Sequence, residues 1–161
     1  MDTYDLNAFT MQCFSLEGKN AVITGANNGV GMGYAYALMK AGANVLIPCL
    51  NDNNWGTLRS AAADCGVQVD FLKGDLCNDA FRAQVVSRAR ERFGSIDILI
   101  NNAGFIIRKP LLECSDRDWT SVMDVNCDAL YFLSRRVAEV MVGQQHGKII
   151  NICSRISFRG G

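Results

Sequence analysis

Apolar runs alternate with amphipathic segments along the whole chain, and this alternation predicts strands joined by helices. The runs are short and rich in β-branched residues, as is typical of buried strands. They predict five strands, over residues 21–24, 43–49, 67–72, 96–100 and 149–153. Between them, apolar residues recur at helical spacing, which predicts helices over residues 29–41, 55–64, 81–93 and 116–142. Residues 1–19 precede the first strand as an N-terminal lead-in.

A glycine-rich turn follows the first predicted strand and opens the first predicted helix. Its glycines are Gly25, Gly29 and Gly31, in the spacing Gly-x-x-x-Gly-x-Gly. Glycines let the backbone turn tightly and approach a pyrophosphate, and the N–H groups at a helix start attract the anion. Strand, glycine loop and helix in this order form the mononucleotide half of a dinucleotide-binding fold. A glycine turn into any helix has a similar pattern, so a purely structural turn stays open.

The order of the predicted elements indicates the fold class. Strands that alternate with helices favour parallel pairing through right-handed crossovers. We therefore expect an α/β protein with a Rossmann-type doubly wound parallel sheet in a three-layer α/β/α arrangement, formed by residues 1–161 as a single domain. Ligands bind such sheets at the carboxyl ends of the strands, near the point where the strand order reverses. These ends are residues 24–31, 49–54, 74–76, 101–106 and 152–157.

Composition argues against several classes of function. Sixteen basic residues balance sixteen acidic ones, whereas binding nucleic acid or an anionic membrane surface would need a basic face. No apolar run of about eighteen residues predicts a membrane span, and the start of the chain lacks the basic region of a signal peptide. The seven cysteines form no Cys-x-x-Cys pair, and the one histidine is His146. We expect a cytoplasmic protein with reduced cysteines and neither a metal site nor a Ser-His-Asp triad.

Five motifs, four at the predicted strand ends and one in the last predicted helix, resemble those of the short-chain dehydrogenase/reductase family. They are the glycine motif with Thr24 before it, Asp75-Leu76, residues 101–104 (Asn-Asn-Ala-Gly), Val125-Asn126 and residues 149–154 (Ile-Ile-Asn-Ile-Cys-Ser). Their order and positions extend the resemblance from about residue 15 to the end of the chain. The resemblance implies an incomplete NAD(P)-binding domain of an oxidoreductase, which moves a hydride between a substrate carbon and a nicotinamide.

The resemblance also implies which residues bind the cofactor. They are Gly25, Asn27, Asn28, Gly29, Val30, Gly31, Asp75, Leu76, Asn102, Ala103 and Gly104. In the family, the carboxylate at the position of Asp75 contacts the adenine amino group, and the segment 102–104 lies along the cofactor. Two structural alternatives stay open. Asp75 could cap the following helix, and the segment 102–104 could be only a tight turn.

Asn126 and Ser154 are the candidate catalytic residues. Asn126 lies on the apolar stripe of the last predicted helix, between Met123 and Leu130, where a buried amide needs hydrogen-bond partners. The resemblance implies an asparagine that distorts this helix and holds a water in a proton relay, and the alternative is a structural asparagine bonded to backbone. Ser154 ends the fifth strand, where a serine is ordinarily a turn residue. The resemblance implies that its hydroxyl polarises the substrate carbonyl, with Ser157 as the weaker candidate.

Within the family, the sequence resembles dehydrogenases of keto and deoxy sugar acids. The resemblance rests on residues 14–19, 54–55, 107–108, 148–152 and 157–161. It implies a small-molecule sugar acid as the substrate. Arg108 would then bind the substrate carboxylate, since a guanidinium pairs with a carboxylate through two hydrogen bonds. An exposed arginine beside Lys109, with no ligand, is the alternative.

One family motif is missing after the catalytic serine. The family's acid–base residue is the tyrosine of a Tyr-x-x-x-Lys motif in that region, and no such motif follows Ser154. Tyr34 and Tyr36 belong to the first predicted helix and are not placed to replace it. We therefore expect a fragment that lacks the C-terminal strands and is inactive alone. Its long helix would lack a helical neighbour, which leaves Trp119 partly bare. The resemblance implies that the full-length form is a homo-oligomer.

The end of the second strand bears on the choice of cofactor. An acidic residue there would bind the ribose hydroxyls of NAD, and a basic one would favour NADP. Cys49 stands at the expected acidic position, Asn51 and Asp52 come slightly later, and no Lys or Arg precedes Arg59. We therefore expect NAD, with NADP left open.

Three hypotheses about function follow. The first is an NAD(P)-dependent oxidoreductase that acts on a sugar acid. The second hypothesis is a non-enzymatic module that binds a dinucleotide or a partner protein, and the missing motif after Ser154 keeps it open. The third is a remnant that does not fold alone.

Overall fold

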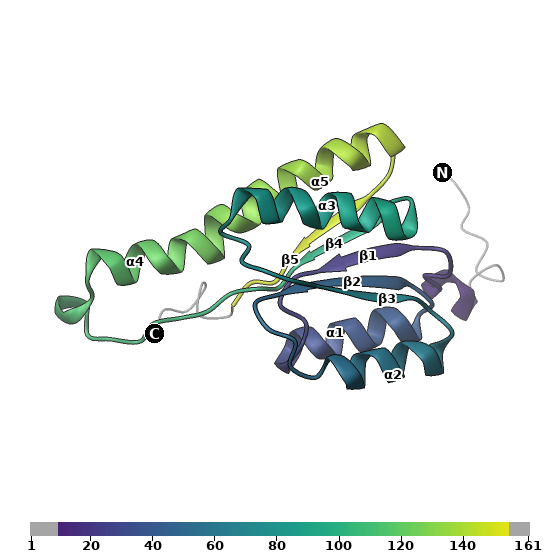
Figure 1. Cartoon of the computed structure of the whole chain (residues 1–161), viewed down its shortest axis with the longest axis horizontal. Coiled ribbons are helices and arrows are strands. Elements are labelled where there is room, and N and C mark those ends of the chain that lie inside the picture. Colours follow the sequence, from purple (N-terminus) through teal and green to yellow (C-terminus); the bar gives the residue numbers. More distant parts are fainter. Residues whose placement is uncertain (1–9, 155–161) are drawn as a thin grey trace, which may run out of the picture.

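The computed structural model of this chain describes residues 10–154. Its strands are β1 (Asn20–Ile23), β2 (Asn44–Cys49), β3 (Val69–Lys73), β4 (Ile98–Asn101) and β5 (Lys148–Asn151). They form one sheet in the order β3-β2-β1-β4-β5 (Figure 1), and every neighbouring pair is parallel. All five predicted strands are therefore confirmed, with β3 and β4 each beginning two residues later and β5 ending two residues earlier than predicted. The strand order reverses at β1, which is hydrogen-bonded to both β2 and β4.

Helices cover both faces of the sheet. The helices α1 (Gly29–Lys40) and α2 (Trp55–Cys65) lie on one face. The helices α3 (Asp79–Phe93) and α5 (Leu130–Gln144) lie on the other face, and α4 (Asp116–Met123) extends beyond the carboxyl ends of the strands (Figure 1). This arrangement confirms the three-layer α/β/α fold. Among residues 10–154, no helix is long and apolar enough to cross a membrane.

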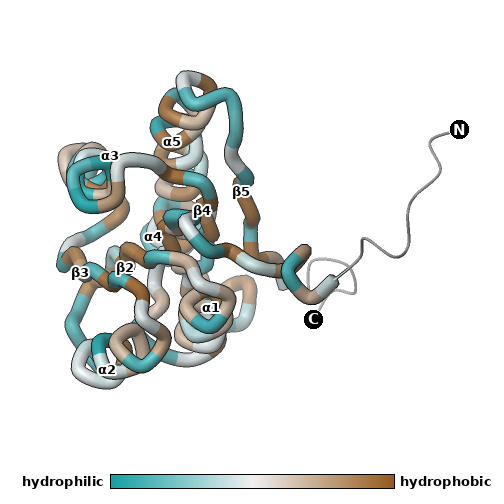
Figure 2. Tube along the Cα trace, turned by 90° about the vertical axis from the view of Figure 1, so that its right-hand side faces the viewer, coloured by the Kyte–Doolittle hydropathy of each residue, from teal (hydrophilic) through white to brown (hydrophobic). Residues whose placement is uncertain are grey.

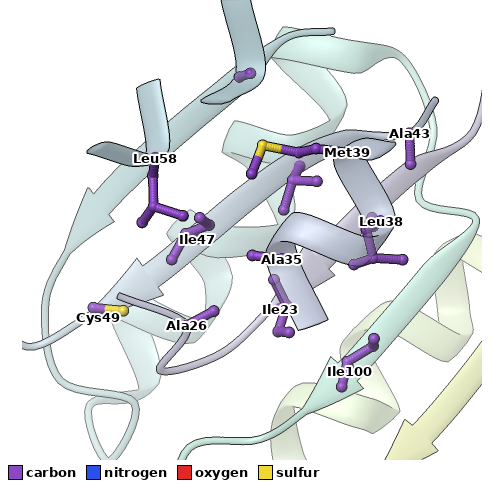
Figure 3. Close-up of a cluster of buried hydrophobic side chains, with 13 residues drawn as sticks. Ile23, Ala26, Ala35, Leu38, Met39, Ala43, Ile47, Cys49, Leu58 and Ile100 are labelled. Atoms are coloured by element: carbon purple, nitrogen blue, oxygen red, sulfur yellow. The ribbon is translucent and has the colours of Figure 1, made fainter. Parts of the chain in front are cut away.

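Adjacent residues of the central strands enter different cores, because successive side chains of a strand point to opposite faces. Ile23 and Ile47 pack under α1 and α2, with Met39 and Leu58 (Figure 3). Their neighbours in β1 and β2 pack on the other face, with side chains from α3 and α5: Val22, Leu46, Phe81, Val85, Leu133 and Val137. Figure 2 shows the resulting concentration of hydrophobic residues in the strands between the helical layers. Burial on both faces explains why these strands are continuous apolar runs.

The prediction of the last helix as one regular element is wrong. Instead of one helix over residues 116–142, α4 is followed by a π-helical segment, Asp124–Ala129, and then by α5. The predicted apolar stripe is confirmed in α5, where Leu133, Val137 and Met141 are buried. In α4 the side chain of Trp119 is 66% exposed, as expected for a helix whose outer face lies bare.

At the amino ends of the strands, the buried carboxylate of Asp97 joins several segments. It accepts hydrogen bonds from the backbone N–H of Asn20 and from Ser95 Oγ, both at 2.9 Å. It also contacts His146 Nε2 at 2.9 Å and Lys19 Nζ at 3.7 Å. Burial opposes ionisation of Asp97, but the hydrogen bonds from Asn20, Ser95 and His146 outweigh it, so the pKa lies below its ordinary value. His146 therefore has a structural role at the amino ends of the strands, on the side of the sheet opposite their carboxyl ends.

We expect Asp97 to make stability depend on pH in the acid range. A carboxyl whose pKa is lower in the folded than in the unfolded chain stabilises the fold above its unfolded pKa of about 3.9. This contribution disappears as the pH falls from about 5 through the lowered pKa. Asp97→Asn should lower the free energy of unfolding at pH 7 by about 1–3 kcal/mol and flatten its decline below pH 5. Urea unfolding at pH 7, 5 and 3 measures both effects.

The matched control for Asp97 is Asp64→Asn, since Asp64 is exposed on α2. This variant should keep both the stability and the pH dependence of the original chain. Equal declines below pH 5 in the original chain and in Asp97→Asn would contradict the role of Asp97.

Candidate functional site

Thr24 joins the carboxyl ends of β1 and β4 at the point where the strand order reverses. The residue is 2% exposed. Its Oγ1 accepts hydrogen bonds from the backbone N–H of Asn102 at 3.0 Å and of Ala103 at 2.9 Å. Its own N–H donates to the carbonyl of Ile100 at 3.1 Å. One hydroxyl therefore holds the Asn-Asn-Ala-Gly turn against the start of the glycine loop.

Two of the loop glycines are required by close packing against that turn. Gly25 has φ +64°, and a Cβ added to it would lie 3.0 Å from the Cα of Ala103. A Cβ on Gly31 would lie 2.3 Å from Nδ2 of Asn102, which donates to the carbonyl of Thr24 at 3.0 Å. Gly29, with φ +53°, has no atom within 4 Å of its Cβ position. Gly25 and Gly31 thus hold the loop on β4, and only the Gly29 side of the loop is open.

Asn27 and Asn28 are neighbours in the glycine loop but differ in burial and in side-chain hydrogen bonding. Asn27 is buried, and its Nδ2 donates to the carbonyl and the Oδ1 of Asn51 at 2.8 and 2.7 Å. Its side chain therefore ties the glycine loop to the segment after β2. Asn28 is exposed, precedes the first turn of α1 and makes no side-chain bond to that turn. The first N–H groups of an α-helix have no partner within the helix, so the exposed start of α1, with Gly29 and Val30, suits an anion.

A cavity of about 240 Å³ opens at the carboxyl ends of the strands. Its lining brings together five residues predicted for the cofactor: Gly25, Asp75, Leu76, Ala103 and Gly104. Six other residues complete the lining: Pro48, Cys49, Leu50, Gly74, Phe105 and Val125. The remaining predicted cofactor residues, in the glycine loop and at Asn102, do not line this cavity. The sequence placed Leu50 at one of the predicted strand ends, residues 49–54, but assigned it no role in the site.

Asp75 does not cap the helix that follows it. Its Oδ1 accepts from the backbone N–H of Cys77 at 2.9 Å, which shapes the turn after β3. The cap of α3 is Asn78, whose Oδ1 accepts from the N–H of Phe81 at 3.2 Å. The capping alternative is therefore wrong, and Asp75 stands as an exposed carboxylate on the wall of the cavity.

Cys49 occupies the position where an acidic residue was expected. It is 5% exposed and lines the cavity. Burial raises the pKa of its thiol, and the backbone N–H groups of Asn27, Ala26 and Gly25 only partly oppose this effect. The end of β2 therefore presents a neutral thiol to the cavity.

Asn126 lies at the centre of the π-helical segment. Its Oδ1 accepts from the N–H of Phe105 at 3.0 Å, and its Nδ2 donates to the carbonyl of Phe105 at 2.8 Å. The local helix distortion implied by the family resemblance is present, and so are the backbone hydrogen bonds of the structural alternative. The predicted burial of this amide is wrong, since Asn126 is exposed. The wider turn of the π-helical segment rotates Asn126 away from the buried apolar face of α5.

Ser154 and Arg108 lie on segments that leave the same edge of the sheet. The ladder of β5 extends to Ile152, whose N–H donates to the carbonyl of Asn101 at 3.0 Å, and Ser154 follows as an exposed residue. Arg108 is exposed on the segment between β4 and α4. Ser157 and the rest of the segment 157–161 lie outside the described residues. Among residues 10–154, no cluster of three side chains could hold a metal ion.

The spacing Tyr-x-x-x-Lys does occur once in the chain, at Tyr36 and Lys40 in α1. With residues of α2, these side chains line a shallow groove between the two helices. The π-helical segment that carries Asn126 leads into α5, which lies on the opposite face of the sheet (Figure 1). Tyr36 is therefore not placed to act as the acid–base residue of this site.

Comparisons with known proteins agree with this geometry. A family model described as short chain dehydrogenase matches residues 19–161. The chain is 42% identical over 161 residues to the uncharacterized oxidoreductase YgcW of Escherichia coli (strain K12), covering 100% of this chain and 61% of that protein. It is 40% identical over 153 residues to the 2-dehydro-3-deoxy-D-gluconate 5-dehydrogenase of the same strain, covering 94% of this chain and 59% of that protein.

A solved structure supports the same assignment. The short-chain type dehydrogenase/reductase from Mycobacterium marinum superposes with a TM-score of 0.85 at 26% identity, covering 91% of this chain and 59% of that one. This chain thus spans about three fifths of the length of the curated relatives that it matches. On the family model, the relatives and the shared fold, the chain belongs to the short-chain dehydrogenase family.

Proposed function

We propose that this chain forms the cofactor-binding part of an NAD(P)-dependent oxidoreductase that acts on a keto or deoxy sugar acid, such as 2-dehydro-3-deoxy-D-gluconate. The observation that carries the proposal is the cavity between the ends of β1, β2, β3 and β4, beside the open start of α1. In doubly wound sheets, dinucleotides bind where the strand order reverses. The substrate class rests on the similarity to the sugar-acid dehydrogenase and on Arg108 as a carboxylate partner.

The residues present fit a dinucleotide. Apolar side chains of Leu50, Leu76 and Val125 line the cavity, which suits a flat adenine ring, and the carboxylate of Asp75 would accept from the adenine amino group. The exposed backbone N–H groups at the start of α1 would bind the diphosphate. The turn at Ala103 and Gly104 would extend the cofactor-binding surface from the adenine toward the nicotinamide.

The nicotinamide would supply the hydride chemistry. In the proposed site, the hydroxyl of Ser154 would donate a hydrogen bond to the substrate carbonyl. The side chain of Asn126 uses one N–H and one lone pair on Phe105. A second N–H and a second lone pair remain to hold a water. Because no Tyr-x-x-x-Lys motif follows Ser154, we expect residues 1–161 to bind cofactor without turning over substrate.

Filling the cavity should abolish most cofactor binding. We expect Val125→Trp to weaken NAD binding by about tenfold or more, a loss of at least about 1.4 kcal/mol, because the indole would occupy the space assigned to adenine. Isothermal titration with NAD and with 5′-AMP measures the change, and thermal melting verifies that the variant is folded. The control is Ser87→Trp on the exposed face of α3, which should bind both ligands normally. Unchanged binding by a folded Val125→Trp chain would overturn the assignment of the cavity.

A second candidate is a module that binds the dinucleotide without catalysis, since Tyr36, the tyrosine of the Tyr-x-x-x-Lys spacing in α1, is not placed to act at this site. The two candidates differ in the binding of a sugar acid to the chain loaded with NAD, which isothermal titration measures without any turnover. Binding of a sugar acid supports the oxidoreductase, whereas NAD binding with no binding of any sugar acid tested supports the module.

A further inference from the structure

The exposed start of α1 carries a dipeptide that is chemically unstable in water. Asn28 is followed by Gly29, and this is the one Asn-Gly step in the sequence. Both residues are exposed. At such a step the backbone nitrogen of the glycine can attack the side-chain amide of the asparagine, because glycine has no Cβ to hinder the approach. The local structure decides whether the asparagine is free to react.

The surroundings of Asn28 leave its amide free to react. Its backbone is extended, with φ −157° and ψ 175°, and its side chain makes no hydrogen bond to the first turn of α1. The N–H of Gly29 begins the helix, where the first N–H groups have no partner within the helix. Among residues 10–154, and apart from its neighbours in the chain, no atom lies within 4 Å of the Cβ position of Gly29. Water and the attacking nitrogen therefore both have access to the amide carbon.

The neighbouring asparagine, Asn27, is protected and serves as an internal comparison. It is 4% exposed. Its Nδ2, the leaving group in the same reaction, donates to the carbonyl and the Oδ1 of Asn51 at 2.8 and 2.7 Å. The residue after it is Asn28, whose side chain hinders the attacking nitrogen. The two asparagines thus differ in burial, in hydrogen bonding and in the residue that follows, although they share one loop.

We propose that Asn28 is a site of spontaneous deamidation and that its product blocks the place of the cofactor diphosphate. The deprotonated backbone nitrogen of Gly29 attacks Cγ of Asn28, so a C–N bond forms and the bond from Cγ to Nδ2 breaks. Nδ2 gains a proton in place of the one that Gly29 lost and leaves as ammonia, and a cyclic imide remains. One water then opens the ring at either carbonyl, which yields aspartate or isoaspartate. No oxidant or reductant takes part.

The product places a negative charge where the helix is most electropositive. The first turn of α1 holds no acidic residue, and the start of a helix carries a partial positive charge. A carboxylate at position 28 would accept from the N–H of Val30 or Gly31, the bonds typical of a capping residue. The effect on binding rests on the proposed function, which assigns these N–H groups to the diphosphate. The carboxylate would therefore both occupy the donors and repel the anion.

Ageing of the purified full chain tests the reaction and its consequence together. The chain is incubated in mildly alkaline buffer, which favours the deprotonated nitrogen. Peptide mapping by mass spectrometry follows the conversion of each amide to a carboxylate, and isothermal titration follows the affinity for NAD. Asn28 should convert faster than Asn27 and faster than Asn53, an exposed asparagine with no glycine after it. The converted chain should bind NAD more weakly by about tenfold.

Two variants and one ligand isolate the reaction. Asn28→Asp carries the aspartate product from the outset, so it should bind NAD about tenfold more weakly than the fresh chain. Its melting temperature should not fall, because a carboxylate at a helix start is stabilising. Asn28→Ser has no amide to attack, so its affinity, whatever its starting value, should stay constant during ageing. Excess NAD should slow the conversion of Asn28, because the bound diphosphate covers the start of α1.

The outcomes separate this inference from the proposed function. If the fresh chain binds NAD and Asn28 converts no faster than Asn53, the inference is overturned and the proposed function stands. Full conversion of Asn28 with unchanged NAD affinity also overturns it. If the folded fresh chain binds no NAD, the proposed function fails together with the effect on binding, and the peptide map still decides whether Asn28 reacts.

Discussion

Thr24→Val is expected to lower the free energy of unfolding by about 2–4 kcal/mol. The substitution keeps the shape of the side chain but removes the oxygen that accepts from the N–H groups of Asn102 and Ala103. Each buried donor left without a partner costs about 1–3 kcal/mol, and Thr24 is buried. The change also frees the turn after β4 from the start of the glycine loop. Urea unfolding, with the slope of the transition compared between variants, measures the loss.

Two control variants separate the hydroxyl of Thr24 from its methyl group. Thr24→Ser keeps the acceptor and removes one methyl, so it should cost about 0.5–1.5 kcal/mol. Thr120→Val changes an exposed threonine of α4, whose hydroxyl donates to the carbonyl of Asp116, and should alter stability by less than about 0.5 kcal/mol. A Thr24→Val chain that is as stable as Thr24→Ser would show that the two hydrogen bonds do not hold the strand ends together.

Gly31→Ala should both destabilise the chain and reduce nucleotide binding. The added Cβ would lie 2.3 Å from Nδ2 of Asn102 and 2.9 Å from the carbonyl oxygen of Gly25. The amide of Asn102 would have to leave its hydrogen bonds to Thr24 and Gly25, or the glycine loop would have to shift. Such overpacking typically costs about 1–3 kcal/mol. The same shift moves the loop and the start of α1, so NAD binding should weaken by about tenfold or more.

Gly33→Ala is the matched control for Gly31, because it lies two residues further along α1 and its Cβ position has no atom within 4 Å. Alanine is a better helix former than glycine by about 0.8–1 kcal/mol, so this variant should be as stable as the original chain or more stable. NAD binding should not change. Equal melting temperatures and equal NAD affinities for the two alanine variants would contradict the packing role of Gly31.

The site was predictable where a motif is local, whereas the long-range contacts of its residues were not. The glycine spacing marked the right loop, but it did not show that Gly25 and Gly31 face Ala103 and Asn102, which lie more than seventy residues away. The family resemblance assigned Asn27 to the cofactor, and nothing in the sequence indicated that its amide binds Asn51. Whether these residues act on a cofactor stays a prediction for the binding experiments.

The ion pair of Asp52 with Lys73 shows the same limit. Along the chain, the segment after β2 holds no Lys or Arg before Arg59. Lys73 comes from the end of β3, and only the parallel pairing of Lys73 with Cys49 brings it to Asp52. The π-helical segment at Asn126 is a further case, since the family resemblance implied a distortion but the apolar spacing predicted a regular helix.

The sequence by itself determined the α/β class, the parallel sheet and its five strands, because apolar periodicity and glycine turns are local properties that each segment carries. It also determined the family, through motifs at the strand ends. The tertiary structure alone decided which side chains meet at those ends: Thr24 with the turn after β4, Asn27 with Asn51, and Asp52 with Lys73. These contacts depend on strand order and register, and strand pairing sets both between segments far apart in the chain.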